Sequence, residues 1–367
     1  MAPDLRRATA LLLASLTVAA CSTGSRKIPA EYMSVPMAAQ IGSVTLAEDG
    51  TVTPSAAPTP ARLSDGAIRV MGAALLNGDK ILAENVTVES LDLSESRGEV
   101  AFSAKRENNF DIALISTDGG AIHWMPNDPA DELAVQWAPR GNKISYVIRA
   151  HGGDVVRTLH IPTAFQFAVP FTNATIHALA WDPQAEHFAV AYSTPDSSDR
   201  VEVLDYKGEK RRTAIPPARQ LDVEVASFAA NAIVMRPREI RYDEKLPLVV
   251  WMADDFSWSD ARAALLARAR VAIVVATDIL DEAFWRATRE IAWIDSSRPW
   301  IVSPEPFFGV EATPGARYIV PGSSLPADMY SHDGTFVTVA PAVVQSFAAG
   351  YIADELERDP PTNGSSR

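Results

Sequence analysis

Three aspartates follow two apolar runs in the last third of the chain. Asp254 and Asp255 come after the run 246–252, and Asp278 comes after the run 271–277. Continuous apolar runs of this length are typical of parallel strands buried on both faces. The carboxyl ends of such strands meet at one sheet edge, where carboxylates can hold Mg²⁺ or Ca²⁺. Aspartate is also common in helix caps and solvated loops, and we favour that second interpretation.

Hydroxyl and imidazole groups that could act in nucleophilic catalysis lie further on. Ser323 and Ser324 follow the predicted strand 317–321, and His332 precedes the last predicted helix. A serine becomes a useful nucleophile when a neighbouring imidazole accepts its proton. These residues are therefore the candidate catalytic set.

Residues 246–357 resemble parts of the α/β-hydrolase domain of the prolyl oligopeptidase family. The strand 247–252 stands where the strand before the oxyanion loop lies in that family, and 331–336 is similar to its catalytic-histidine loop. The resemblance implies a serine hydrolase or peptidase in which His332 is the base.

The motif for the nucleophile departs from that family. Ser303 ends the third predicted strand, but neither flanking glycine of G-x-S-x-G is present and Pro304 follows it. Asp254 and Asp255 stand where the family has His-Gly-Gly, and carboxylates there would repel a developing oxyanion. The sequence thus favours a degenerate, non-catalytic relative. A hydrolase would need Ser323 or Ser324 as an unconventional nucleophile.

The N-terminus has the pattern of a signal peptide that ends at a cysteine. Arg6 and Arg7 precede an apolar run of about 13 residues, too short to span a bilayer. Residues 18–21 (Val-Ala-Ala-Cys) resemble the bacterial lipobox, which implies that Cys21 is lipidated and becomes the first mature residue. Cys21 is the only cysteine, so no disulfide can form within the chain. An ordinary secretory signal is the alternative.

A repeat with a spacing of 44 residues organises the middle of the chain. Leu93, Trp137 and Trp181 are separated by this spacing, and each is followed by two alternating strands. Such a period with several short strands is typical of propeller blades. Residues 137–146 resemble the core of the TolB-like, WD-type propeller repeat. Residues 224–240 stand where a fourth copy would fall. We expect the tryptophans to be inter-blade core rather than a binding face.

The predicted fold is mainly β, a propeller-like array of blades followed by a small α/β three-layer domain. The expected segments are a signal peptide (1–20), a lipidated tether rich in Pro, Ser and Ala (21–66), blades (67–244), the α/β domain (245–357) and a disordered tail (358–367). Residues 42–53 could instead form a hairpin that turns at Asp49-Gly50. The blade count and the closure of the propeller stay open.

Composition limits the partners. The chain has 367 residues, 47% of them hydrophobic, and a net charge of −13, which disfavours nucleic acid. No cofactor is expected. The histidines show no metal-ligand spacing, and we predict that they are blade surface and turn residues; they are His123, His151, His160, His177, His187 and His332.

These observations predict a lipoprotein of the bacterial cell envelope, anchored to the membrane through Cys21. Ser22 after the cysteine favours the outer membrane. The leading function is non-catalytic binding of a protein, peptide or glycan by the blades. The alternative is a serine hydrolase, and a third interpretation is a divalent-ion sensor at Asp254, Asp255 and Asp278.

Overall fold

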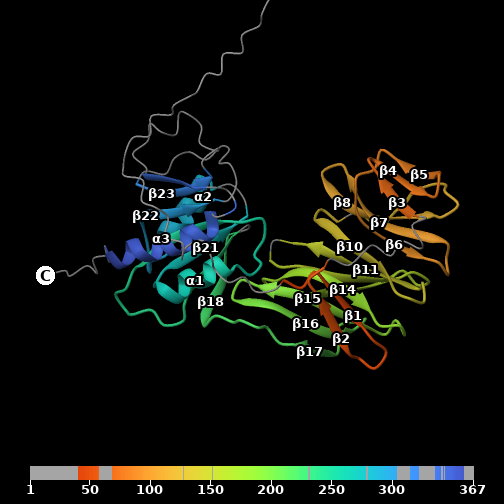
Figure 1. The fold of residues 1–367 in the computed structure, drawn as a ribbon, viewed down its shortest axis with the longest axis horizontal. Coiled ribbons are helices and arrows are strands. Elements are labelled where there is room, and N and C mark those ends of the chain that lie inside the picture. The colour runs from red at the N-terminus through yellow and green to blue at the C-terminus, as the bar shows by residue number, and fades with distance from the viewer. Residues whose placement is uncertain are drawn as a thin grey trace, which may run out of the picture.

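The computed structural model contains a propeller-like array of β-sheets and a separate α/β layer (Figure 1). It describes residues 40–57, 68–126, 128–150, 152–229, 232–277, 280–303, 315–321, 335–339, 342 and 344–358. The fold class is the one that the sequence predicts.

Three antiparallel four-stranded sheets form the complete blades. The first consists of β6 (Val88–Ser94), β7 (Glu99–Arg106), β8 (Asn109–Ser116) and β9 (His123–Trp124). The second consists of β10 (Asp131–Trp137), β11 (Lys143–Arg149), β12 (Val155–His160) and β13 (Phe165–Pro170). The third consists of β14 (Thr175–Trp181), β15 (His187–Thr194), β16 (Ser197–Asp205) and β17 (Arg211–Ile215). Consecutive strands pair in order, so β6, β10 and β14 are edge strands of their sheets.

The repeated tryptophans lie in the core between blades, as expected. Trp137 and Trp181 are 2% and 3% exposed. Trp137 packs with Ile112 of the first blade, and Trp181 packs with Val147 of the second. Burial of large apolar side chains between neighbouring sheets is what holds stacked repeats together.

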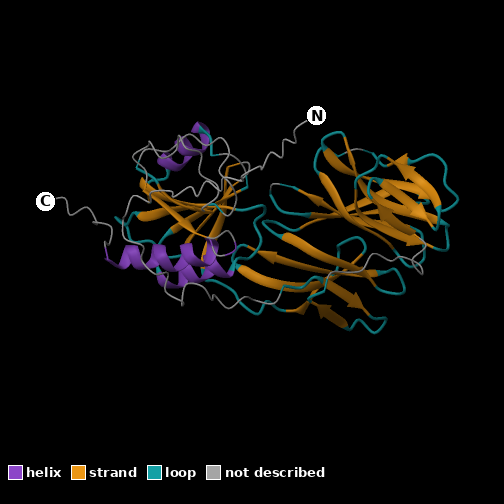
Figure 2. Cartoon of the chain, turned by 45° about the horizontal axis from the view of Figure 1, so that its top comes forward, coloured by secondary structure: helices purple, strands orange, loops and turns teal. Residues whose placement is uncertain are grey.

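Two smaller sheets end the array. A three-stranded sheet of β3 (Ile68–Met71), β4 (Ala74–Asn77) and β5 (Lys80–Glu84) packs on the first blade. A hairpin of β1 (Ser43–Leu46) and β2 (Val52–Ser55) packs on the third. Figures 1 and 2 show these sheets at opposite ends of an open arc.

The hairpin corrects the predicted tether, which was drawn through residue 66. Val44 and Leu46 are buried against Ala178 and Ala189 of the third blade. The Asp49-Gly50 turn forms as in the hairpin alternative, with Gly50 at a φ of +81° that glycine adopts without strain. Burial of these alternating apolar residues explains why the segment folds instead of remaining a linker.

The α/β layer is a seven-stranded sheet in the order β18-β19-β21-β20-β22-β23-β24. Its strands are β18 (Val223–Ala229), β19 (Ala232–Pro237), β20 (Leu246–Met252), β21 (Ala272–Ala276), β22 (Ile294–Val302), β23 (Arg317–Pro321) and β24 (Thr335–Val339). The five strands from β20 to β24 run parallel, and β18 and β19 are antiparallel.

The position of β18 and β19 corrects the predicted fourth blade at 224–240 and the domain boundary at 245. Ile233, Val234 and Met235 of β19 pair with β21 and are buried on both faces. A strand buried on both faces belongs inside a sheet covered by two layers, and the α/β sheet provides that environment. The 44-residue spacing alone could not distinguish the two sheets.

Three helices cover this sheet on both faces (Figure 2). α1 (Asp260–Arg268) and α3 (Val344–Arg358) pack on one face, and α2 (Glu282–Glu290) packs on the other. Ser259 and Asp281 cap the first turns of α1 and α2 by accepting hydrogen bonds from main-chain N–H groups. No helix in the described ranges is long and apolar enough to cross a membrane.

Candidate functional site

A groove of about 840 Å³ runs along the inside of the arc of blades. Its walls come from β6, β10, β14 and the hairpin strand β1. The lining is mostly small or apolar, and the residues on these strands are Glu89–Asp92, Ala134–Gln136, His177–Trp181, Gly42 and Val44–Leu46, with Pro139 and Pro183 at the turns. Concave surfaces of this size are typical ligand sites.

The groove is lined by strand edges rather than by strand faces. Four consecutive residues of β6 and five of β14 line it. Side chains alternate between the two faces of a strand, so a face would contribute only every second residue. The groove is therefore lined by the main chain of edge strands, which have N–H and C=O groups that no ladder partner uses.

Polar side chains cap part of these edges. Ser90 Oγ accepts from Val135 N (3.1 Å), Asp92 Oδ2 accepts from Trp137 N (2.7 Å), and Gln136 Nε2 donates to the Leu179 carbonyl. Each cap reaches from one of the edge strands that line the groove (the innermost strands β6, β10 and β14) to the next. The caps explain how buried Asp92 is tolerated, because a buried carboxylate needs hydrogen-bond donors.

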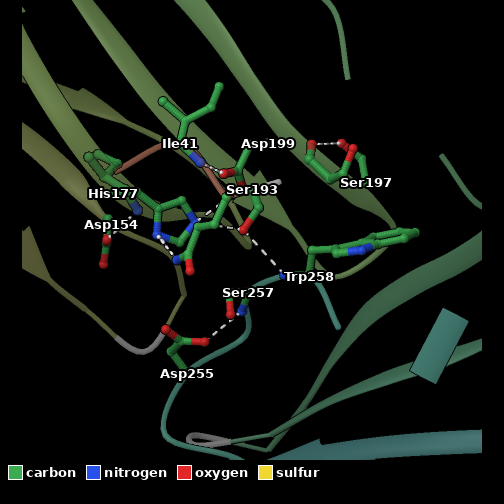
Figure 3. A network of polar contacts seen from close by, with 12 residues as sticks. Ile41, Asp154, His177, Ser193, Ser197, Asp199, Asp255, Ser257 and Trp258 are labelled. Atoms are coloured by element: carbon green, nitrogen blue, oxygen red, sulfur yellow. Dashed lines mark hydrogen bonds and ion pairs between the residues drawn. The ribbon is translucent and has the colours of Figure 1, made fainter. Parts of the chain in front are cut away.

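His177, which lines the groove, belongs to a network of polar contacts, here called the polar junction (Figure 3). His177 Nε2 lies 2.9 Å from Ser193 Oγ and 3.5 Å from Asp199 Oδ1. Asp199 accepts from Ile41 N, and Trp258 N donates to Ser193 Oγ at 3.2 Å. The junction thus connects the segment before β1, the third blade and the loop before α1.

The junction has the residue types of a catalytic triad but not its geometry. Ser193 and Asp199 both approach the same imidazole nitrogen, whereas an orienting acid should bind the other nitrogen. His177 Nδ1 faces the Gln40 side-chain nitrogen at 3.5 Å. No carboxylate among the described residues bonds Nδ1, so the imidazole lacks the orienting acid that a triad places there. Ser193 is also only 1% exposed.

Buried charges surround the junction. Burial raises the pKa of Asp154, although Arg149 at 3.1 Å opposes this effect. Asp154 also accepts from Ile176 N, which anchors the start of β14. Burial lowers the pKa of Arg262 to about 10, and Asp255 partly offsets it. Arg262 donates to the Ser257 carbonyl and so fixes the loop that carries Trp258.

Two of the three aspartates of the predicted carboxylate site, Asp254 and Asp255, are among the described residues. Asp254 is exposed, and Asp255 Oδ1 accepts from Ser257 N at 2.8 Å, which is a loop-capping role. Asp278 lies outside the described residues. Within the described part of the chain, no group of three or more His, Cys, Asp or Glu side chains could hold a metal ion.

The other candidate residues lie outside the described ranges: Cys21, Ser323, Ser324 and His332. Ser303 is described, is 5% exposed, and its N–H bonds the Ile319 carbonyl at 3.1 Å. This bond continues the sheet past β22, so the described main chain at Ser303 is extended.

The sequence did not single out the residues that line the groove or form the junction. His177 was expected at a blade surface or turn, but it lies half-buried on β14 in a β-bulge. The bulge turns the His177 side chain toward Ser193. A regular strand without a bulge would not predict this orientation. Ser90 and Asp92 precede the residues that they cap, Val135 and Trp137, by the same number of positions. This regular spacing is the sign of the caps that the sequence contains.

Comparisons with known proteins find distant structural likeness only. No family model matches, and no curated protein matches. Oligopeptidase B from Leishmania major is 9% identical, with a TM-score of 0.47, over 62% of this chain and 41% of that one. The acylaminoacyl peptidase of Pyrococcus horikoshii is 12% identical, with a TM-score of 0.47, over 62% and 42%.

A prolyl endopeptidase structure is 10% identical, with a TM-score of 0.47, over 70% of this chain and 44% of that one. This chain therefore spans less than half the length of each of these three peptidases.

Proposed function

We propose that this chain is a lipid-anchored protein of the cell envelope that binds a polypeptide segment in its groove without catalysing a reaction. The observation that supports this most directly is the groove itself, about 840 Å³ in volume and walled by the edges of innermost strands. Rigid blades hold these edges in place, so little conformational entropy is lost when a ligand binds.

A polypeptide fits the lining better than the other ligand classes. Trp181 is the one Phe, Tyr or Trp residue among the lining residues, and at 3% exposed it offers no ring face on which a sugar could stack. The net charge of −13 disfavours phosphate-rich ligands. Main-chain groups at strand edges instead suit the amide groups of another chain.

The proposed anchor is Cys21, with the residues before β1 acting as the connection to the membrane. Several acyl chains on one cysteine anchor a protein durably, whereas a single chain binds reversibly. The outer membrane is the proposed location.

Photo-crosslinking tests the binding function. Benzoylphenylalanine replaces Glu89, an exposed residue of the groove, and in a control it replaces Phe165, which is 68% exposed on the outermost strand β13. We expect polypeptide adducts from Glu89 and not from Phe165, identified by mass spectrometry in cells that express the full chain. Equal labelling at both positions, or adducts that contain only sugar, would reject the proposal.

A serine hydrolase of the prolyl oligopeptidase type is the second candidate function. The observation that favours it is that His177, which lines the groove, bonds Ser193. Ser193 in turn accepts from Trp258 N in the loop before α1, at the carboxyl edge of the parallel strands. Ligands of α/β sheets bind at that edge.

A fluorophosphonate probe tests this alternative. A hydrolase should be labelled at Ser323 or Ser324, and His332→Ala should abolish the labelling because the base is lost. Absence of labelling in the folded protein would leave the binding function alone.

A further inference from the structure

The innermost strands direct alternate main-chain groups into the groove. In the second blade, Ala138 N bonds the Lys143 carbonyl at 2.9 Å. Paired residues of antiparallel strands alternate between bonded and non-bonded positions, so Trp137 directs its N–H and C=O away from β11. In the third blade, the bond from Asp182 N to the His187 carbonyl directs the main chain of Trp181 inward in the same way.

Caps satisfy these inward groups in the second blade. Ser90 and Asp92 of β6 accept from Val135 N and Trp137 N of β10. Two 44-residue periods after Ser90 and Asp92, the equivalent positions on β14 are Ala178 and Ala180. These two alanines line the groove, and their methyl side chains have no polar atom that could cap the next strand.

The next strand along the arc is β1, because the hairpin occupies the place of a further blade. Turn-to-turn contacts show this continuity, since Arg140 donates to Gln184 and Gln184 Nε2 donates to Glu48 at 2.7 Å. The hairpin's own last bonded pair is Ala47 N to the Thr51 carbonyl, at 2.9 Å. By alternation, Val44 and Leu46 direct their main-chain groups away from β2.

We infer that the free edge of β1, at Val44 and Leu46, is where the ligand binds, and that the ligand is an extended peptide that adds to this edge as a β-strand. This inference rests on the proposed function and specifies its ligand and its contact. No side chain of the described residues caps these two positions, in contrast to Val135 and Trp137.

The geometry selects the chemistry of the ligand. An added strand uses its own N–H and C=O groups, so a polypeptide in extended conformation fits and a folded surface does not. Residues in a strand rise about 3.3 Å each, so the edge from Val44 to Leu46 faces about three ligand residues. Ala178 and Ala180 line the groove beside this edge, and their small side chains leave room for those of the ligand.

The decisive variant installs the missing caps. Ala178→Ser with Ala180→Asp reproduces the pair found at Ser90 and Asp92, and the new side chains should bond the N–H groups of Val44 and Leu46. We expect the affinity for a pool of random nine-residue peptides to fall by about tenfold or more, because the ligand must then displace two hydrogen bonds.

Ala134→Ser is the matched control. Ala134 lines the same groove at the equivalent position of β10, beside β14 instead of β1, so this substitution should leave peptide affinity unchanged. Equal losses in both variants would overturn the assignment to β1. A thermal melt of each variant identifies a folding defect.

Two measurements keep the inference testable if the double variant does not fold. In the native chain, the amide hydrogens of Val44 and Leu46 should exchange faster than the bonded amide of Ala47 and become protected when peptide is added. N-methylation of alternate residues in a bound peptide should abolish its binding, because it removes the ligand's own donors.

The outcomes separate this inference from the proposed function. Slow exchange at Val44 and Leu46 in the free protein would show that another segment of the chain or a second copy already pairs with the edge, which overturns the inference. Peptide binding without protection there would keep the binding function and reject this site. Absence of any peptide binding would reject both.

Discussion

A buried carboxylate connects the first two blades. Glu132 on β10 is 0% exposed, its Oε2 accepts from Ile112 N of β8 at 3.1 Å, and its main-chain carbonyl accepts from Ser103 Oγ of β7. Arg157 Nη1 lies 3.8 Å from Oε1, too far for a strong hydrogen bond. Burial therefore dominates and raises the pKa of Glu132 to about 7.

This pKa predicts how stability depends on pH. The folded value of about 7 lies above the ordinary value of 4.5, so the stabilisation is complete below about pH 4.5 and is lost as pH rises toward 7. Glu132→Gln replaces the titratable carboxyl group with a neutral amide. Relative to the native chain, the variant should gain on the order of 2–3 kcal/mol in unfolding free energy between pH 4 and pH 8.

Urea unfolding at several pH values measures this difference. Glu95→Gln, on an exposed turn, is the control and should show no such trend. A stability difference between Glu132→Gln and the native chain that does not change with pH would contradict the assignment.

At the scale of elements, side-chain size decides where the hairpin docks. β15 alternates between large residues that face the second blade, such as Phe188 and Tyr192, and small ones that face the hairpin, Ala189 and Ala191. Val44 and Leu46 fill the space above these alanines. Interiors are close-packed, so this face accepts the hairpin only while its residues remain small.

Ala191→Leu should therefore displace the hairpin. Overpacking of a filled core costs about 1–3 kcal/mol, and here most of that cost falls on the hairpin because the blade behind it is held by four paired strands. The amide of Ala47, bonded to the Thr51 carbonyl, should exchange faster while the amides of β11 are unaffected.

Thr53→Leu adds a similar side chain on the exposed face of the hairpin and serves as the control. If Ala191→Leu left the exchange of Ala47 unchanged, the hairpin would not depend on this packing.

At the scale of the whole molecule, polar contacts connect the blades to the α/β layer. Arg219 pairs with Asp260 at 2.8 Å, and Trp258 N donates to Ser193 Oγ at 3.2 Å. Half-exposed ion pairs contribute little to stability, typically below about 1 kcal/mol. These contacts between the two parts are polar, whereas each part has its own apolar core.

The proposed lipid anchor makes a prediction for the whole chain. Cys21→Ser removes the thiol that would carry the lipid, so the protein should move from the membrane pellet to the soluble fraction. The melting temperature of the released protein should equal that of the anchored protein, because no described core contains Cys21. Retention of the variant in the pellet would contradict lipidation at this residue.

The sequence by itself determined the features that depend on local pattern. The 44-residue period and the alternating strands predicted the blades, since side chains alternate along any strand. Trp137 and Trp181 were predicted to be inter-blade core because they recur at equivalent positions of the repeat, and both are buried.

Only the tertiary structure decided which edges meet. The period could not show that β19 joins the α/β sheet, because its apolar run satisfies either environment. Nor could it show that the hairpin follows the third blade, that a bulge turns His177 toward Ser193, or that Ala178 and Ala180 leave the edge of β1 uncapped. Each of these depends on contacts between residues far apart in the chain, which local pattern does not specify.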